Sequence, residues 1–130
     1  MIELRVDHRN GLPVYQQIVQ QVKHALRLGL LVPGDRMPTV RELVATLAIN
    51  PNTVMKAYRE LELAGLIGGR VGQGTFVLKS LNGSSPDDLA EMRAGLEAWL
   101  ARAKALGLDD ESVTALIDTT LDAARRREQP

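Results

Sequence analysis

The sequence predicts a mainly α-helical fold, in which three short helices and a two-stranded hairpin are followed by two further helices. Three observations predict it. Apolar residues recur at helical spacing between about residues 13 and 64, Asn50-Pro51 marks a sharp helix start, and glycines at 72 and 74 separate two short apolar runs. This is the element order of a winged helix-turn-helix with a C-terminal two-helix segment.

The first helix is expected from about Pro13 to Leu28. Pro13 has the backbone angle of a first helical turn, and Gly29 can end the helix. The residues expected to be buried share one face and are Val14, Ile18, Val22, Ala25 and Leu26.

The second helix is expected to begin at the capping box Thr39-Val40-Arg41-Glu42 and to end near Leu47, after a turn at Pro33-Gly34-Asp35. In such a box the threonine hydroxyl accepts a hydrogen bond from the backbone N–H of the glutamate, whose side chain reaches back. The sequence therefore defines this helix start closely.

The third helix is expected to begin after the N-cap Asn50, with Pro51 in its first turn, and to stop at Gly65. Its expected buried stripe is Val54, Ala57, Tyr58, Leu61 and Ala64. Strands at 66–69 and 75–78 then form a hairpin, because the glycines between them permit the positive φ angles of its turn. This hairpin is the wing.

Residues 81–85 have linker composition, so a DNA-binding domain is expected at 1–79 and a helical dimerisation segment at 80–130. A helix that starts at Ser85-Pro86 and ends at Gly107 carries apolar residues at alternating spacings of three and four. This seam consists of Leu89, Met92, Leu96, Trp99, Ala103 and Leu106. It either pairs two subunits, with Leu96 and Trp99 at the centre, or packs the two helices of one subunit together, and both can hold.

The last helix is expected to begin after the N-cap Asp109 and to place three arginines near its C-terminal end. It also has an apolar stripe, which consists of Val113, Leu116, Ile117, Thr120, Leu121 and Ala124. The second module is therefore expected to contain two amphipathic helices.

Composition narrows the class of protein. The 130 residues include no cysteine, which excludes disulfides and thiolate metal sites. No apolar run approaches the roughly 20 residues of a membrane span, and the N-terminus lacks a signal-peptide pattern. A soluble cytoplasmic protein without membrane contact is therefore expected. The net charge of zero is uneven: residues 1–80 hold ten lysines and arginines against six carboxylates, a balance of +4 that the remainder offsets with −4. A basic front suggests a polyanionic partner, although scatter in short segments is the alternative.

The exposed first turns of the third helix are the expected DNA readers. Asn52 can bond adenine through two hydrogen bonds, Thr53 can use its hydroxyl or methyl group, and Met55 can contact only apolar groups such as a thymine methyl. Lys56 and Arg59 are expected to bind phosphate. Alternatively, Asn52 and Thr53 only form a polar first turn.

Three further residues are candidates for DNA contact. Arg41 lies in a first helical turn, where a cation is unfavourable, so either it contacts phosphate or guanine or it pairs with Asp35. Thr39 is primarily a cap whose hydroxyl can also meet phosphate. Arg70 at the hairpin edge can enter the minor groove or contact phosphate, or it is an ordinary exposed strand residue.

Catalysis is not expected. His8 and His24 lie in different elements without a second ligand at metal-binding spacing, and neither has a nucleophile arranged beside it. The acidic pairs at 87–88 and 109–110 stand at helix starts, where capping explains them. No cofactor is therefore expected, and the chain is not predicted to be an enzyme.

Four segments within about residues 11–78 closely resemble the GntR family of bacterial transcription regulators. They are Pro-Gly-Asp-Arg-Met-Pro-Thr-Val-Arg-Glu-Leu, Asn-Pro-Asn-Thr-Val, Leu-Ala-Gly-Leu-Ile and Gly-Gln-Gly-Thr-Phe-Val. The two short C-terminal helices resemble its YtrA subfamily. The resemblance implies a homodimeric repressor on a palindromic operator, often near transporter genes. It also matches Arg41, Asn50, Asn52 and Thr53 to DNA-contacting positions and Gly72 to the wing tip.

The chain departs from this resemblance at three positions. Met55 stands where the subfamily usually has glutamine or arginine, and Val71 and Gln73 stand in the wing where basic residues are common. Both changes weaken polar and phosphate contacts. We therefore expect a smaller dependence of DNA affinity on salt, by about one unit of slope per lost phosphate contact.

The sequence thus predicts a DNA-binding transcription regulator, with double-stranded DNA and a second copy of the chain as partners. The alternative is a winged-helix protein-interaction module without specific DNA binding, which overall neutrality permits. Ligand sensing near Trp99 is a third possibility, but two helices enclose little volume. The sequence does not identify an operator, a regulated gene or an effector.

Overall fold

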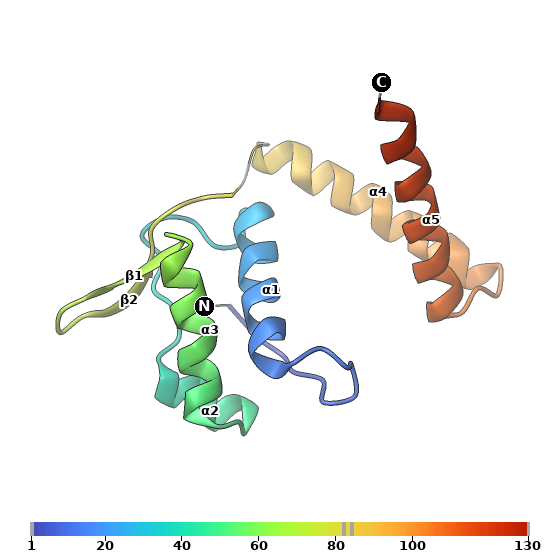
Figure 1. Ribbon diagram of the computed structural model, residues 1–130. Helices are drawn as coiled ribbons and strands as arrows, with labels where there is room; N and C mark the ends of the chain where they lie inside the picture. The colour runs from blue at the N-terminus through green and yellow to red at the C-terminus, as the bar shows by residue number, and fades with distance from the viewer. Residues whose placement is uncertain (1, 82, 84, 130) are drawn as a thin grey trace. The chain divides into compact units, whose positions relative to one another are not determined.

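The computed structural model describes residues 2–81, 83 and 85–129, and these form two compact units, residues 1–86 and 87–130 (Figure 1). The division between the units falls after Pro86, whereas the sequence places the DNA-binding domain at 1–79 and the dimerisation segment at 80–130. These functional ranges stay predictions. In the described chain, no helix is long and apolar enough to cross a membrane.

The first unit contains the helices α1 (Val14–Arg27), α2 (Val40–Leu47) and α3 (Pro51–Leu63). Each lies within about a residue of its predicted range, because the caps in the sequence form as expected. The Thr39 hydroxyl accepts a hydrogen bond of 3.0 Å from the Glu42 backbone N–H, and Asn50 Oδ1 accepts one of 2.8 Å from Asn52 N–H. Gly65, with φ of 75°, follows the C-cap of α3 and turns the chain into the hairpin.

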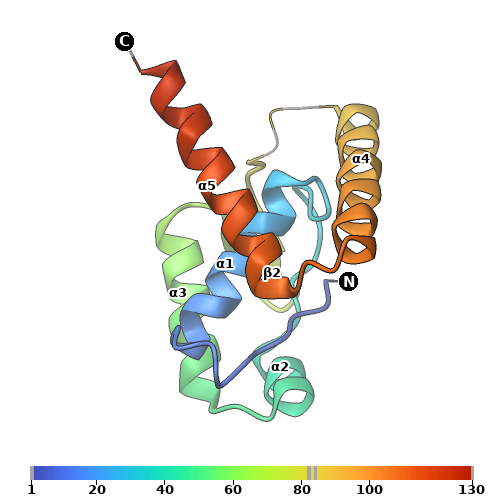
Figure 2. The ribbon, with the colours of Figure 1, turned by 90° about the vertical axis from the view of Figure 1, so that its right-hand side faces the viewer.

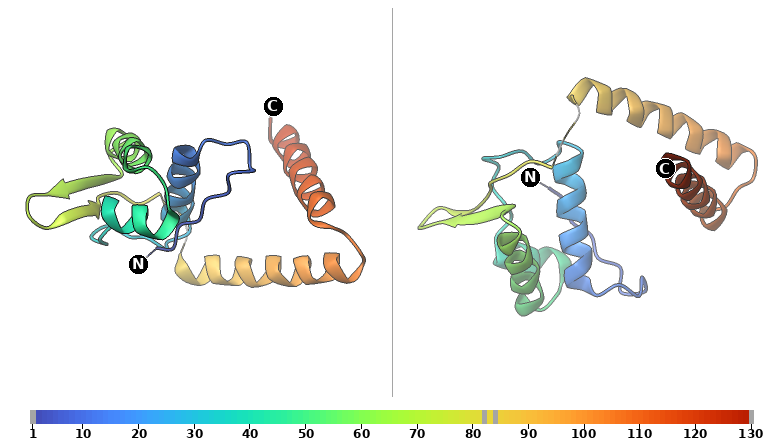
Figure 3. Two further views of the ribbon diagram at one scale, coloured as in Figure 1. Left: turned by 90° about the horizontal axis from the view of Figure 1, so that it is seen from below. Right: turned by 45° about the horizontal axis from the view of Figure 1, so that its top comes forward.

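Strands β1 (Ile67–Arg70) and β2 (Gly74–Val77) form the wing, with the antiparallel pairs running from Ile67 with Val77 to Arg70 with Gly74. Both strands are shifted by one residue from the predicted ranges. The segment 35–37 adds to the free edge of β2: Met37 N–H donates to Thr75 O at 2.8 Å, and Val77 N–H donates to Asp35 O at 2.8 Å. The turn that precedes α2 therefore also supports the wing (Figure 3).

The core of the first unit lies where α1 packs against α3 and where β1, β2 and Met37 cover them. The predicted apolar faces are buried: Ile18, Val22 and Leu26 are fully enclosed on α1, as are Val54 and Leu61 on α3. One prediction is wrong. Ala64 is exposed: it is the C-cap residue, one position beyond the last residue of α3, Leu63.

A buried glutamine that the sequence did not single out fixes the N-terminal segment against α1. Gln17 is only 5% exposed, and its amide nitrogen donates to the backbone oxygens of Asp7 and Leu12, each at 2.8 Å. Its Oε1 accepts from Asp7 N–H at 2.8 Å. Both amide hydrogens donate and the amide oxygen accepts, so each polar atom of the buried side chain has a partner.

The second unit consists of α4 (Pro86–Ala105) and α5 (Asp110–Glu128). Gly107, with φ of 88°, follows the end of α4 as predicted. The Asp109 carboxylate caps α5 by accepting a hydrogen bond of 2.8 Å from Ser112 N–H. Hydrogen bonds from the side chain and backbone of Ser112 lower the pKa of the Asp109 carboxyl. Leu106 lies just beyond the end of α4, not within the seam helix.

Candidate nucleic-acid interface

The N-terminal turn of α3 presents polar side chains at the end of the helix that follows α2. Asn50 uses its side-chain oxygen as the cap, so its amide nitrogen is the group that remains for a ligand. Asn52 is exposed and Thr53 is half-buried. α2 lies beside this end of α3 (Figures 1 and 2), so the starts of both helices lie on the same side of the unit.

The exposed residues of α3 form one stripe opposite its buried face. Asn52, Met55 and Arg59 are spaced by three and four, and all three are exposed, with Met55 at 47%. This spacing places them on one helical face. The half-exposed Met55 thus lies between the amide of Asn52 and the cation of Arg59. This order suits contact with a DNA major groove, whose base edges include both thymine methyl groups and polar atoms.

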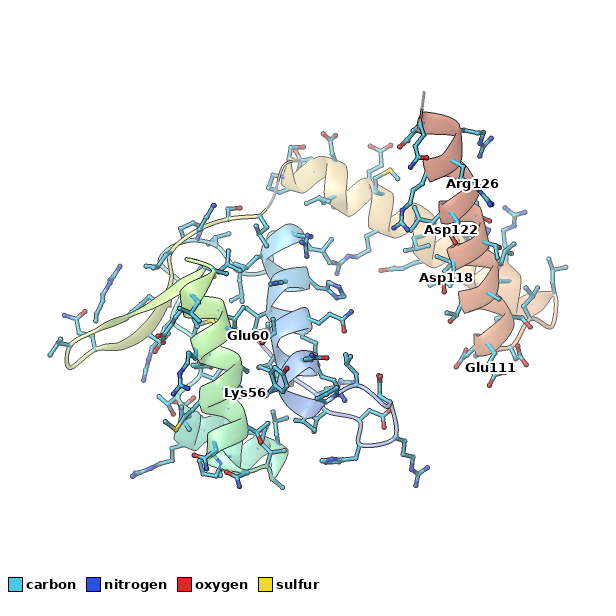
Figure 4. The ribbon with its side chains drawn as sticks, in the orientation of Figure 1. Lys56, Glu60, Glu111, Asp118, Asp122 and Arg126 are labelled. Atoms are coloured by element: carbon cyan, nitrogen blue, oxygen red, sulfur yellow. The ribbon has the colours of Figure 1, made fainter. Side chains whose placement is uncertain are left out.

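Lys56 differs from the neighbouring residues of this stripe because it makes a contact within the chain. Its Nζ lies 4.0 Å from the centre of the Tyr15 ring of α1, a cation–π contact. Figure 4 shows Lys56 and Glu60 on the side of α3 that faces α1. The assignment of Lys56 to phosphate stays a prediction, and the structure adds that its ammonium group is held beside α1.

At the start of α2, Arg41 is exposed and has no ion-pair partner among the described residues. Asp35, the expected alternative partner, instead accepts a hydrogen bond of 3.0 Å from Val32 N–H. Thr39 is half-buried and its hydroxyl is engaged in the cap. Arg41 is thus the cation at this helix start whose donors remain available to a ligand.

A buried hydrogen bond joins α3 to the segment that begins α2. The Tyr58 hydroxyl donates to the backbone oxygen of Pro38, next to the cap Thr39. Burial, and to a smaller extent the nearby Glu42 carboxylate, raises the pKa of Tyr58 well above its usual range. The phenol therefore stays protonated and ties the middle of α3 to the segment that begins α2.

Tyr58→Phe should lower the free energy of unfolding by about 1 to 2 kcal/mol, because the buried Pro38 oxygen loses its donor. The raised folded-state pKa means that the contribution of the phenol is complete below the unfolded value of about 10 and is lost as pH rises above it. Urea unfolding at increasing alkaline pH should show a steeper loss for wild type than for the variant. Equal pH slopes would contradict this role of the hydroxyl.

The wing has a glycine at its tip and an arginine at its edge. Gly72 adopts a φ of 73° at the exposed tip, where glycine is favoured, and Val71 beside it is fully exposed. The Arg70 guanidinium carbon lies 4.4 Å from the centre of the Phe76 ring. Sequence reasoning missed Arg36, which forms an isolated bridge with Phe76 and brings a second arginine to the wing.

The structure brings the candidate DNA residues together within the first unit and places the seam in the second. His8 and His24 are both exposed. Among the described residues, no three side chains of the metal-binding types lie close enough to hold an ion. What the first unit offers instead is two capped helix starts and an arginine-bearing hairpin.

The chain is similar to proteins of one family. The family described as bacterial regulatory proteins of the gntR family matches residues 14–77. The HTH-type transcriptional regulator Rv1152 of Mycobacterium tuberculosis is 43% identical over 81% of this chain and 83% of its own length. The HTH-type transcriptional repressor YtrA of Bacillus subtilis is 46% identical over 57% of each, so the chain matches little more than half of that relative.

A solved structure is similar over the first module. The DNA-binding domain of AraR in complex with operator ORX1 is 27% identical with a TM-score of 0.52, over 59% of this chain and 99% of that one. The relatives are named as transcription regulators, not as enzymes. The winged helix, the capped recognition helix and these similarities show that the chain belongs to the GntR family of bacterial transcription regulators and, consistent with its YtrA-named relative, to the YtrA subfamily.

Proposed function

We propose that the chain is a cytoplasmic, homodimeric transcriptional repressor that binds a palindromic operator. In this proposal the first unit reads DNA and the second joins two subunits. One observation carries the DNA-binding part: the exposed stripe of α3 begins at a capped helix end, and the exposed Arg41 in the first turn of α2 has no ion-pair partner among the described residues. The YtrA relative is named a repressor, and the AraR domain was solved with an operator.

The residues proposed to contact DNA come from α2, α3 and the wing. Asn52, Thr53 and Met55 would meet base edges, because the first turns of a recognition helix enter the major groove. The others would hold the backbone or the minor groove, namely Thr39, Arg41, Asn50, Lys56, Arg59, Arg70 and Gly72.

The dimer is proposed because a single recognition helix covers too few base pairs for useful selectivity. Two copies related by a twofold axis would read half-sites roughly 34 to 36 Å apart, about one turn of DNA. The proposed interface is the seam of Leu89, Met92, Leu96, Trp99, Ala103 and Leu106. Its support is that Met92 and Leu96 remain 72% and 50% exposed in the chain.

Selection of bound sites from a random pool of duplex DNA tests the proposal. We expect an inverted repeat whose half-sites are centred about one helical turn apart, or a multiple of it. Retention on random DNA across a salt gradient is the companion measurement. An asymmetric single site would contradict the dimer, and binding that is absent or insensitive to salt would favour the protein-interaction module, which the zero net charge of the chain permits.

A further inference from the structure

The outer face of the hairpin consists of Arg36, Gly68, Arg70, Gly74 and Phe76. Gly68 and Arg36 both pair directly with Phe76, one from each side, and Gly74 pairs with Arg70. Since side chains alternate along a strand, residues 68 and 70, and residues 74 and 76, point to one side of the sheet. The opposite side carries Ile67 and Val77, each 1% exposed, and faces the core.

Two arginines lie along this outer face, one over the Phe76 ring and one whose backbone pairs with Phe76. Arg70 stacks on the ring at 4.4 Å. Arg36 and Phe76 form the pair between two flanking backbone hydrogen bonds, the geometry that brings opposite side chains closest. The Arg36 side chain then extends along β2 toward the tip, because its Nε lies 3.4 Å from where a Cβ of Gly74 would be.

The two glycines of this face have different neighbours. At Gly74 a φ of 116° disfavours other residues, and an added Cβ would lie in contact with the Arg36 side chain. At Gly68 the Leu78 side chain fills the space, 2.7 Å from the position of an added Cβ. The surface around Phe76 is thus built from two cations and one half-buried aromatic ring.

No carboxylate neutralises these arginines within the described part of the chain. Glu3 and Asp35 line the same shallow surface depression as Arg36, yet neither is within ion-pair distance of it. Arg36 and Arg70 lie on opposite sides of β2 and carry the same charge, so an anion bound over this face would interact favourably with both. Stacking on an aromatic ring keeps the N–H edges of a guanidinium free for such an anion.

We propose that Arg36, together with Arg70 on the Phe76 ring, forms a phosphate clamp on the outer face of the hairpin that grips the DNA backbone beside the wing. This inference rests on the proposed DNA-binding function and adds a contact residue to it. Val71 and Gln73 leave the wing tip without cations, and the clamp supplies positive charge from the strand and from the segment that pairs with it.

The test measures operator affinity of the full chain against salt concentration for Arg36→Gln, Arg70→Gln and the double variant. Each single change removes one phosphate contact from each half-site of the dimer, so it should reduce the slope of log affinity against log salt by about two, and the double change by about four. From about 50 to about 200 mM salt, wild type should therefore lose about 12-fold more affinity than either single variant. Base preference should stay unchanged, because phosphate contacts carry no sequence information.

Two matched variants serve as controls. Arg36→Lys keeps the charge and should keep the slope, whereas Arg27→Gln removes an exposed arginine at the end of α1 and should leave the slope at its wild-type value. Thermal unfolding checks that all variants fold alike. An unchanged slope for Arg36→Gln, or an altered base preference, would overturn the clamp while leaving the function intact. Failure of wild type to bind any duplex would overturn the function itself.

Discussion

Leu96→Asp should raise the dissociation constant of the dimer by at least about a thousandfold and leave a folded monomer in solution. In a twofold dimer each substitution is present in both subunits. Each lost leucine removes about 2 kcal/mol of apolar burial from the free energy of dimerisation. A carboxylate enclosed in an apolar seam adds a further cost of desolvation. Analytical ultracentrifugation over a range of protein concentrations measures the effect directly.

The second unit explains why this effect is expected to be large. Ala103 is the residue of α4 that is buried, and no described residue of α5 is buried. Packing within the chain buries Ala103 and half-buries Leu89 and Trp99 but leaves Met92 and Leu96 exposed, so it covers only part of the seam. Apolar residues on both helices remain 38 to 50% exposed, namely Leu96, Leu100, Leu116, Ile117 and Leu121. A unit of this kind needs another surface to bury its apolar faces.

Ala94→Asp is the matched control for Leu96→Asp. Ala94 is exposed on the same helix, about 160° around the axis from Leu96, so it introduces the same charge away from the seam. It should leave the dimer unchanged. For Leu96→Asp, operator affinity should fall by about 10² to 10⁴, because the second half-site is no longer linked to the first. A Leu96→Asp protein that sediments as the wild-type dimer would exclude the seam as the interface.

Much of the fold was predictable because its boundaries depend on local chemistry. The cap of Thr39 on Glu42 N–H and that of Asn50 on Asn52 N–H involve residues two or three positions apart, so sequence alone specifies them. The stop at Gly65 is equally local. The prediction that Ala64 is buried was wrong for a related reason: helical spacing extended the apolar stripe one residue beyond the end of α3 at Leu63.

The features that the sequence did not reveal depend on contacts between distant residues. Arg36 stands in a turn and gains its position only because that segment pairs with β2 forty residues later. Lys56 meets Tyr15 across two helices, and the pKa of Tyr58 is raised by burial that only the packed core creates. Local patterns locate elements, whereas the partners of individual side chains depend on packing between elements.

Asn52→Ala should lower affinity for the selected operator by between about 30-fold and about 10⁴-fold. An amide that bonds adenine through two hydrogen bonds contributes about 1 to 3 kcal/mol, and a symmetric dimer uses it in both half-sites. The salt slope should not change, because no phosphate contact is lost. Competition among operators substituted at each base pair should show that the variant loses its preference at one position per half-site.

Two neighbouring variants separate base reading from the other roles of this helix end. Arg59→Gln should flatten the salt slope and keep the base preference, the opposite of the result for Asn52→Ala. Asn50→Ser retains a capping oxygen and adds no charge, so any loss of DNA binding would come from the missing amide donor, while Asn50→Ala should also cost about 1 kcal/mol of stability. If Asn52→Ala bound every operator variant with the wild-type order of affinities, Asn52 would be a polar residue of the first turn and base selection would rest on Thr53 and Met55.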